Sequence, residues 1–209
     1  PSASGHTAGV KSLKNIVKYA GEIGIKYLTV YAFSTENWGR KKEEVQFLMF
    51  LFNETFKKEM KELEENNVKI KIIGDLSKLP AELQQTLNTT MENTRQNTGL
   101  HLQIAINYGA RDELTNAIKN IAADVKAGKI TTDEINPDII SQYLYTNDIP
   151  DPDLLIRTSG EYRISNYLLW QIAYSELYVT DTLWPDFGKS ELDNAIMDFA
   201  SRNRRFGKG

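Results

Sequence analysis

The spacing of apolar residues along the chain predicts helices that alternate with strands. Apolar residues recur every three to four positions in the predicted helices, which are residues 8–23, 43–65, 80–96, 111–127, 137–144 and 189–203. Short runs rich in β-branched and aromatic residues predict strands at 27–33, 68–73, 100–106, 153–156 and 177–179. We therefore expect one α/β domain over residues 1–209, with a mostly parallel central sheet flanked by helices.

The predicted helix at 43–65 has more apolar surface than one core-facing stripe requires. Phe47, Phe50 and Leu51 widen its apolar face around the first half. A helix that is apolar nearly all round is buried on two sides. One side would pack on the sheet and the other would line an apolar cavity. The alternatives are an ordinary core helix and a face that a partner chain covers.

Composition narrows the possible chemistry. The net charge of −3 argues against a general nucleic-acid binder, which would carry a basic face. The absence of cysteine excludes disulfides and thiolate metal sites, and it permits a reducing cytosol. The histidines are His6 and His101 alone, which disfavours a histidine-based zinc site. Any metal would then be a hard cation on carboxylates, such as Mg²⁺.

Polar loops follow four of the predicted strands. Because ligands bind beyond the carboxyl ends of strands in open parallel sheets, we expect these loops to meet at one edge. Glycine amides, hydroxyls and arginines, whose planar groups suit phosphate oxygens, are the donors that these loops provide. The arginines concerned are Arg40, Arg111, Arg157 and Arg163.

Residues 157–166 carry the sharpest of these signals. Arginines, hydroxyls and a glycine within one short stretch are typical of a diphosphate clamp. The alternative is that Arg157 and Arg163 pair with Glu161 and Glu176 on a solvated surface, because ion-pair networks also gather charge. Composition leaves both interpretations open.

Trp38 and His6 also have two interpretations each. Trp38 follows a buried strand, where it would either cap the core or shield a reacting centre that its polar neighbours position. His6 precedes the first predicted helix, whose amino terminus attracts anions, so it would contact a phosphate there. Otherwise His6 is an ordinary capping or surface residue.

Taken in order, these segments resemble the cis-prenyltransferase family of the undecaprenyl diphosphate synthase type. The similar segments are YAFSTENW (31–38), IGD (73–75), NYG (107–109), DPDLLIRTSGE (151–161), RISN (163–166), LLWQ (168–171), LWPDF (183–187) and RRFG (204–207). So long an ordered set is highly specific, unlike a lone glycine motif. The resemblance extends from Gly5 to the carboxyl terminus.

The resemblance implies an enzyme that condenses isopentenyl diphosphate with farnesyl diphosphate in the cis configuration. The product would be undecaprenyl diphosphate, the lipid carrier precursor for bacterial cell-wall synthesis. An apolar tunnel would hold the growing chain, and Mg²⁺ would be the cofactor. The resemblance also implies a cytoplasmic homodimer, formed through residues 177–179 and 183–184, whose lipid product brings it near the membrane surface.

The resemblance also assigns roles to single residues. Those that would hold the diphosphate of isopentenyl diphosphate are Arg157, Arg163 and Ser165, and the residue beside Mg²⁺ would be Glu176. The catalytic residues would be His6, Ser34 and Asn37, with His6 near the allylic diphosphate, where it would assist departure or proton movement. The reaction centre and tunnel mouth would be lined by Phe33, Ser34, Asn37, Trp38, Arg40 and Glu44. The tunnel would be lined by Ala32, Val68 and Leu100, with Leu100 near its floor.

One departure from the family pattern bears on activity. The family begins with a strand and an Asp-Gly-Asn-Gly-Arg-Trp loop whose Asp is the central catalytic residue and binds Mg²⁺, and residues 1–209 do not contain it. Ser2 stands near the place of a further family arginine. We expect the segment to precede Pro1 in the natural protein, because every other loop is intact. The alternatives are a non-catalytic partner subunit of a cis-prenyltransferase complex and a general phosphate-binding α/β module.

Overall fold

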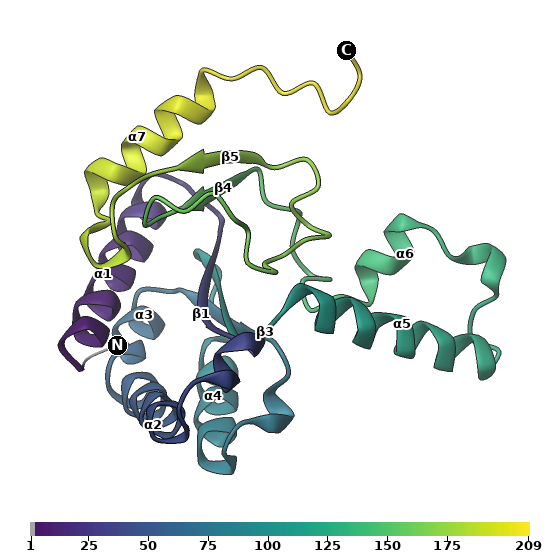
Figure 1. Ribbon diagram of the computed structural model, residues 1–209, viewed down its shortest axis with the longest axis horizontal. Coiled ribbons are helices and arrows are strands. Elements are labelled where there is room, and N and C mark those ends of the chain that lie inside the picture. Colours follow the sequence, from purple (N-terminus) through teal and green to yellow (C-terminus); the bar gives the residue numbers. More distant parts are fainter. Residues whose placement is uncertain (1–2) are drawn as a thin grey trace.

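Helices and strands alternate along the chain as the apolar pattern predicts (Figure 1). The computed structural model describes residues 3–209, so Ser2 lies outside the described residues. The helices are α1 (Ala3–Glu22), α2 (Lys42–Lys58), α3 (Met60–Glu65), α4 (Ala81–Thr94), α5 (Ala110–Lys126), α6 (Pro137–Gln142) and α7 (Lys189–Ala200). The strands are β1 (Tyr27–Ser34), β2 (Lys69–Ile73), β3 (His101–Tyr108), β4 (Leu154–Arg157) and β5 (Glu176–Val179).

The strands form two parallel sheets. One sheet has the order β1-β3-β2, and the other consists of β4 and β5. All residues of β3 after His101 are buried, as expected for a central parallel strand with helices on both faces. The predicted parallel α/β fold is therefore confirmed. Within residues 3–209, β4 and β5 form a pair of their own that is not hydrogen-bonded to the three-stranded central sheet.

The main hydrophobic core lies between the three-stranded sheet and helices α1, α2, α3 and α4. Its members from these elements include Val17, Phe52, Phe56, Leu63, Leu87, Leu102 and Ile104. Helices α5 and α6 extend away from the rest of the molecule (Figure 1). None of the helices in the described part of the chain is long and apolar enough to cross a lipid bilayer.

Three element boundaries differ from the predictions. Helix α1 begins at Ala3, so His6 lies inside the helix and not before it. Gly5 and Gly9 do not stop this helix, because packing of its apolar face outweighs a glycine cost of about 1 kcal/mol each. The predicted helix at 43–65 is two helices, which Glu59 separates. The polar loop after β1 contains a 3₁₀ helix, Thr35–Gly39.

Candidate active site

The carboxyl ends of the first three strands meet around Asn107. This buried residue is the second-last of β3 and has a φ of 49°, in the left-handed region. Its Oδ1 accepts a hydrogen bond from the Trp38 indole Nε1 at 2.7 Å, and its Nδ2 donates to the Asp75 carbonyl at 2.8 Å. The loops that follow β1 and β2 are therefore tied to the end of β3.

Asn166 connects the fourth loop to the same place. Its Nδ2 donates to Glu36 Oε1 at 2.9 Å, and its Oδ1 accepts from the Arg111 backbone N–H at 3.0 Å. Ser165 and Asn166 have φ values of 54° and 61°, a conformation that non-glycine residues adopt mostly at turns and functional sites. The predicted meeting of four loops at one edge is confirmed by these contacts.

The arginines of these loops do not share one environment. Arg163 is largely exposed and forms an ion pair with Glu161 at 2.6 Å. The solvated ion-pair interpretation therefore holds for Arg163. Arg40 is likewise exposed and pairs with Glu44 at 3.0 Å. Glu44 and Glu161, the carboxylates of these two pairs, do not form an ion pair with Arg157.

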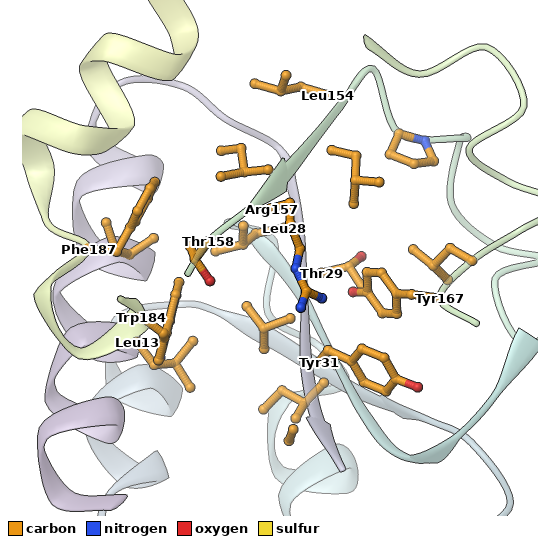
Figure 2. A pocket seen from close by; sticks show the side chains of 18 of the residues that line it. Leu13, Leu28, Thr29, Tyr31, Leu154, Arg157, Thr158, Tyr167, Trp184 and Phe187 are labelled. Carbon is orange, nitrogen blue, oxygen red and sulfur yellow. The ribbon is translucent and has the colours of Figure 1, made fainter. Parts of the chain in front are cut away.

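Arg157, at the end of β4, points into a large cavity whose lining also includes Arg163. Figure 2 shows its side chain extending from β4 toward β1, where Thr29 and Tyr31 lie. Its Nε is buried without a hydrogen-bond partner, and among residues 3–209 no carboxylate forms an ion pair with its guanidinium. Because a buried donor atom of a cation ordinarily has a partner, the partly buried Arg157 is suited to an anionic ligand.

The cavity that Arg157 enters has a volume of about 1170 Å³ and lies between α1, α2, β1 and the β4–β5 sheet. Most of its wall is apolar. The apolar part of the lining includes Val10, Leu13, Val30, Phe52, Phe56, Met60 and Ile104. Trp184 and Phe187 stack near the α1 side of the same space (Figure 2). A hydrocarbon chain suits such a wall, and an anionic group suits the part of the lining that carries Arg157 and Arg163.

His6 lines the same cavity from α1. Its Nε2 lies 2.7 Å from Thr55 Oγ1 on α2, and its ring packs edge-on against Phe52 with centroids 6.2 Å apart. Burial lowers the pKa of His6 below its ordinary value. The neutral imidazole is therefore favoured, and this form can accept a proton.

The predicted residues around β1 occupy two distinct places. Phe33, Ser34 and Asn37 line the cavity, and the Ser34 backbone N–H donates to Asn37 Oδ1 at 2.9 Å. Phe33 is buried and meets the Trp38 ring edge-on, with centroids 5.2 Å apart. Trp38, together with the Arg40–Glu44 pair, lies outside the cavity lining. The ring of Trp38 therefore caps the core at Phe33, as one of its two interpretations predicts. Its indole N–H binds Asn107 and so connects the loop after β1 to the end of β3.

The predicted tunnel residues also divide. Ala32 lines the cavity, whereas Val68 and Leu100 are buried in the adjoining core and do not reach it. Helix α2 does form a wall of the cavity, but through Phe52 and Phe56. The predicted wall position of Phe47 and Phe50 is wrong, because the rotation of α2 turns both toward solvent. Leu51, which is partly buried, does not line the cavity either.

Glu176 lies away from Arg157. It begins β5 opposite Leu154, whereas Arg157 ends β4, and its Oε1 is 3.5 Å from Arg202 Nη1. Within residues 3–209 no three histidine or acidic side chains gather closely enough to hold a metal ion. The assignment of Glu176 to the metal stays a prediction.

Sequence reasoning missed a buried carboxylate beside the meeting point of the loops. Glu113, in the first turn of α5, is 2% exposed and accepts hydrogen bonds from Tyr108 Oη at 2.5 Å, Gln171 Nε2 at 3.0 Å and the Tyr145 N–H at 2.8 Å. These bonds tie the end of β3 to the segments before β4 and after Asn166. Nothing in the sequence signals this role, because an acidic residue in the first turn of a helix is ordinarily a solvated one.

Comparison with known proteins agrees with this geometry. A family profile described as "Putative undecaprenyl diphosphate synthase" matches residues 1–207. The isoprenyl transferase of Clostridium perfringens is 52% identical over 99% of this chain and 82% of its own length, and that of Bacillus cereus is 49% identical over 99% and 80%.

Two solved structures have the same fold. The lavandulyl diphosphate synthase of Lavandula x intermedia, solved with dimethylallyl diphosphate, matches with a TM-score of 0.94 and 38% identity over 98% of this chain and 88% of its own. A probable undecaprenyl diphosphate synthase of Campylobacter jejuni matches with a TM-score of 0.86 and 36% identity over 96% and 92%. The chain therefore belongs to the undecaprenyl diphosphate synthase family of prenyltransferases.

Proposed function

We propose that this chain condenses isopentenyl diphosphate with an allylic diphosphate, farnesyl diphosphate, and extends it in the cis configuration to undecaprenyl diphosphate. The observation that supports the proposal is the unpaired Arg157 in the wall of a large, mostly apolar cavity. The cation requires an anion, and the cavity wall requires a hydrocarbon. An isoprenoid diphosphate combines both in one molecule.

The proposed reaction is an electrophilic alkylation. The bond between the allylic carbon and its diphosphate oxygen breaks, and the diphosphate leaves with the electron pair. The π bond of isopentenyl diphosphate supplies the electrons for the new carbon–carbon bond. Loss of a proton then forms the new cis double bond, so the products are a longer allylic diphosphate, diphosphate and one proton.

The residues of this chain would position and neutralise the reactants. Arg157, with Arg163 and Ser165, would bind the diphosphate of isopentenyl diphosphate. His6 has its neutral form favoured and lines the cavity, so it would accept or move a proton near the allylic diphosphate. The apolar wall would exclude water, which otherwise captures a carbocation-like centre.

The metal, the assembly and the compartment are predicted from the family resemblance. Mg²⁺ would neutralise diphosphate charge when bound, and the steps above are assigned to residues of this chain. Leu177 and Leu183 are 46% and 55% exposed, which leaves both available to a second copy of the chain. A cytoplasmic homodimer is the assembly that we propose.

An incorporation assay tests the proposed function. Protein with its natural amino-terminal sequence is given radiolabelled isopentenyl diphosphate, farnesyl diphosphate and Mg²⁺, and the chain length of the extracted product is read by chromatography. We expect label in a long polyprenyl product, and we expect chelation of Mg²⁺ to reduce it. Folded protein that incorporates no label under these conditions would instead support the non-catalytic partner subunit.

Leu100→Ala is expected to lengthen the product. Leu100 is 6% exposed in the core that adjoins the cavity, so its truncation opens volume beyond the present wall. The same truncation of a buried leucine costs about 2–5 kcal/mol of stability. Product length is read in the incorporation assay, beside the free energy of unfolding.

Two further variants make this result specific. Leu87→Ala, at a fully buried position on α4, carries a similar stability cost without opening the cavity, and it should leave product length unchanged. Met60→Ala removes a side chain that lines the cavity and is 1% exposed. If Met60→Ala lengthens the product and Leu100→Ala does not, Leu100 has no part in limiting chain length.

A further inference from the structure

The outer face of α2 carries large apolar side chains that nothing in the described chain covers. Phe47 and Phe50 are 42% and 57% exposed, and their spacing of three positions places them side by side on the helix. Neither side chain lines the cavity that Arg157 enters. The proposed reaction therefore makes no use of them.

A shallow hollow continues this apolar surface. It has a volume of about 490 Å³, and its lining includes Trp38, Met49, Phe50, Leu79 and Pro80. Trp38 is 36% exposed, and its indole N–H is held by Asn107. The exposed aromatic surface therefore extends from α2 to the meeting point of the loops, and we call Trp38, Phe47 and Phe50 the aromatic face.

Positive charge borders the aromatic face. Lys41 and Lys42 precede its two phenylalanines, and Lys78 lies in the lining of the hollow. None of these three lysines forms an ion pair with another residue of the described chain. Glu43 is the opposing charge at the start of α2, whereas Glu44 and Glu82 are paired with Arg40 and Lys57, respectively. Glu54, one turn after Phe50, is paired with Lys58, so the border of the aromatic face carries a net positive charge.

We propose that the aromatic face docks on the surface of a lipid bilayer that carries anionic headgroups. Exposed tryptophan and phenylalanine beside lysine is the composition of helices that lie in the bilayer interface, with rings in the headgroup region and lysines on anionic lipids. This docking rests on the proposed function, because the polyprenyl diphosphate product of that reaction would pass from the protein into a bilayer.

Vesicle co-sedimentation tests the docking. Protein is mixed with vesicles of phosphatidylcholine alone or of phosphatidylcholine with phosphatidylglycerol, and the bound fraction is measured at increasing salt. We expect binding to the anionic vesicles that weakens with salt. The double variant Phe47→Ser/Phe50→Ser should bind at least about tenfold more weakly, because it lacks the two rings that would be buried in the bilayer. Lys41→Gln/Lys42→Gln should bind roughly tenfold more weakly, through lost attraction to the lipid.

Ile118→Ser is the matched control. Ile118 lies on α5 and is 64% exposed, so the substitution removes a similarly exposed apolar side chain from another part of the surface. It should leave vesicle binding unchanged. Circular dichroism and thermal unfolding confirm that each variant is folded.

Two outcomes would overturn the docking proposal. One is equal binding by the wild-type chain and the Phe47→Ser/Phe50→Ser variant. The other is a change of oligomeric state in that variant, by sedimentation velocity, without any change in vesicle binding, which would make the aromatic face a contact between protein copies. Failure of the proposed function is a separate result, because it is measured as missing product with substrates in detergent solution.

Discussion

Arg157→Met is expected to lower kcat/KM for isopentenyl diphosphate by roughly 10²–10³-fold, which is the usual effect of removing one donor that stabilises an anion. The same variant should keep or raise the free energy of unfolding. The reason is that Arg157 Nε is buried without a partner, so methionine removes the cost of burying a charge and leaves no carboxylate unpaired. Steady-state kinetics and denaturant unfolding measure the two effects.

Two variants control for the loss of an arginine as such. Arg95→Met removes an exposed arginine that pairs with Glu92 on α4, and it should change neither activity nor stability by much. Arg157→Lys keeps the charge without the planar fork, so its activity should lie between those of the wild type and Arg157→Met. Full activity in Arg157→Met would remove this residue from diphosphate binding.

Gly74→Ala should destabilise the fold by more than about 3 kcal/mol, the range for strain at a special backbone conformation combined with a steric clash. Gly74 follows β2 with a φ of +134°, and a Cβ built there lies 1.9 Å from the Ile106 carbonyl oxygen. Neither the φ value nor the close approach of the two backbones admits a side chain. The free energy of unfolding from urea titration measures the effect.

Gly21→Ala is the matched control for this substitution. Gly21 lies in α1, and a Cβ there meets no atom within 4 Å. Alanine should therefore stabilise the helix by roughly 0.5–1 kcal/mol. The two glycine substitutions should change stability in opposite directions, and a mild Gly74→Ala variant would contradict the backbone packing described at the end of β2.

The buried Glu113 holds the end of β3 against the segments before β4 and after Asn166. Its three hydrogen-bond donors belong to three different segments of the chain. Because a buried donor without a partner costs about 1–3 kcal/mol, these bonds hold the segments together. The polar atoms around Glu113 are therefore hydrogen-bonded within the protein, whereas Arg157 Nε has no hydrogen-bond partner. A guanidinium without a partner inside the protein is suited to bind an anionic ligand.

Local sequence was sufficient to predict most elements and their order. The predicted strand at 68–73 is β2, Lys69–Ile73, and the predicted helix at 111–127 is α5, Ala110–Lys126. These predictions succeed because apolar periodicity and turn residues act over a few positions. The meeting of the loops was also predictable, since parallel strands place their carboxyl ends at one edge.

Only the tertiary structure decided whether a given charged or apolar side chain forms an ion pair, lines the cavity or faces solvent. Arg157 and Arg163 are six positions apart and both line the cavity, yet Arg163 pairs with Glu161 whereas Arg157 has no carboxylate partner among the described residues. The rotation of α2 about its axis directs Phe52 into the cavity and Phe50 toward solvent. A side chain's direction depends on which distant segment packs against its element, and the periodicity of one segment carries no information about that neighbour.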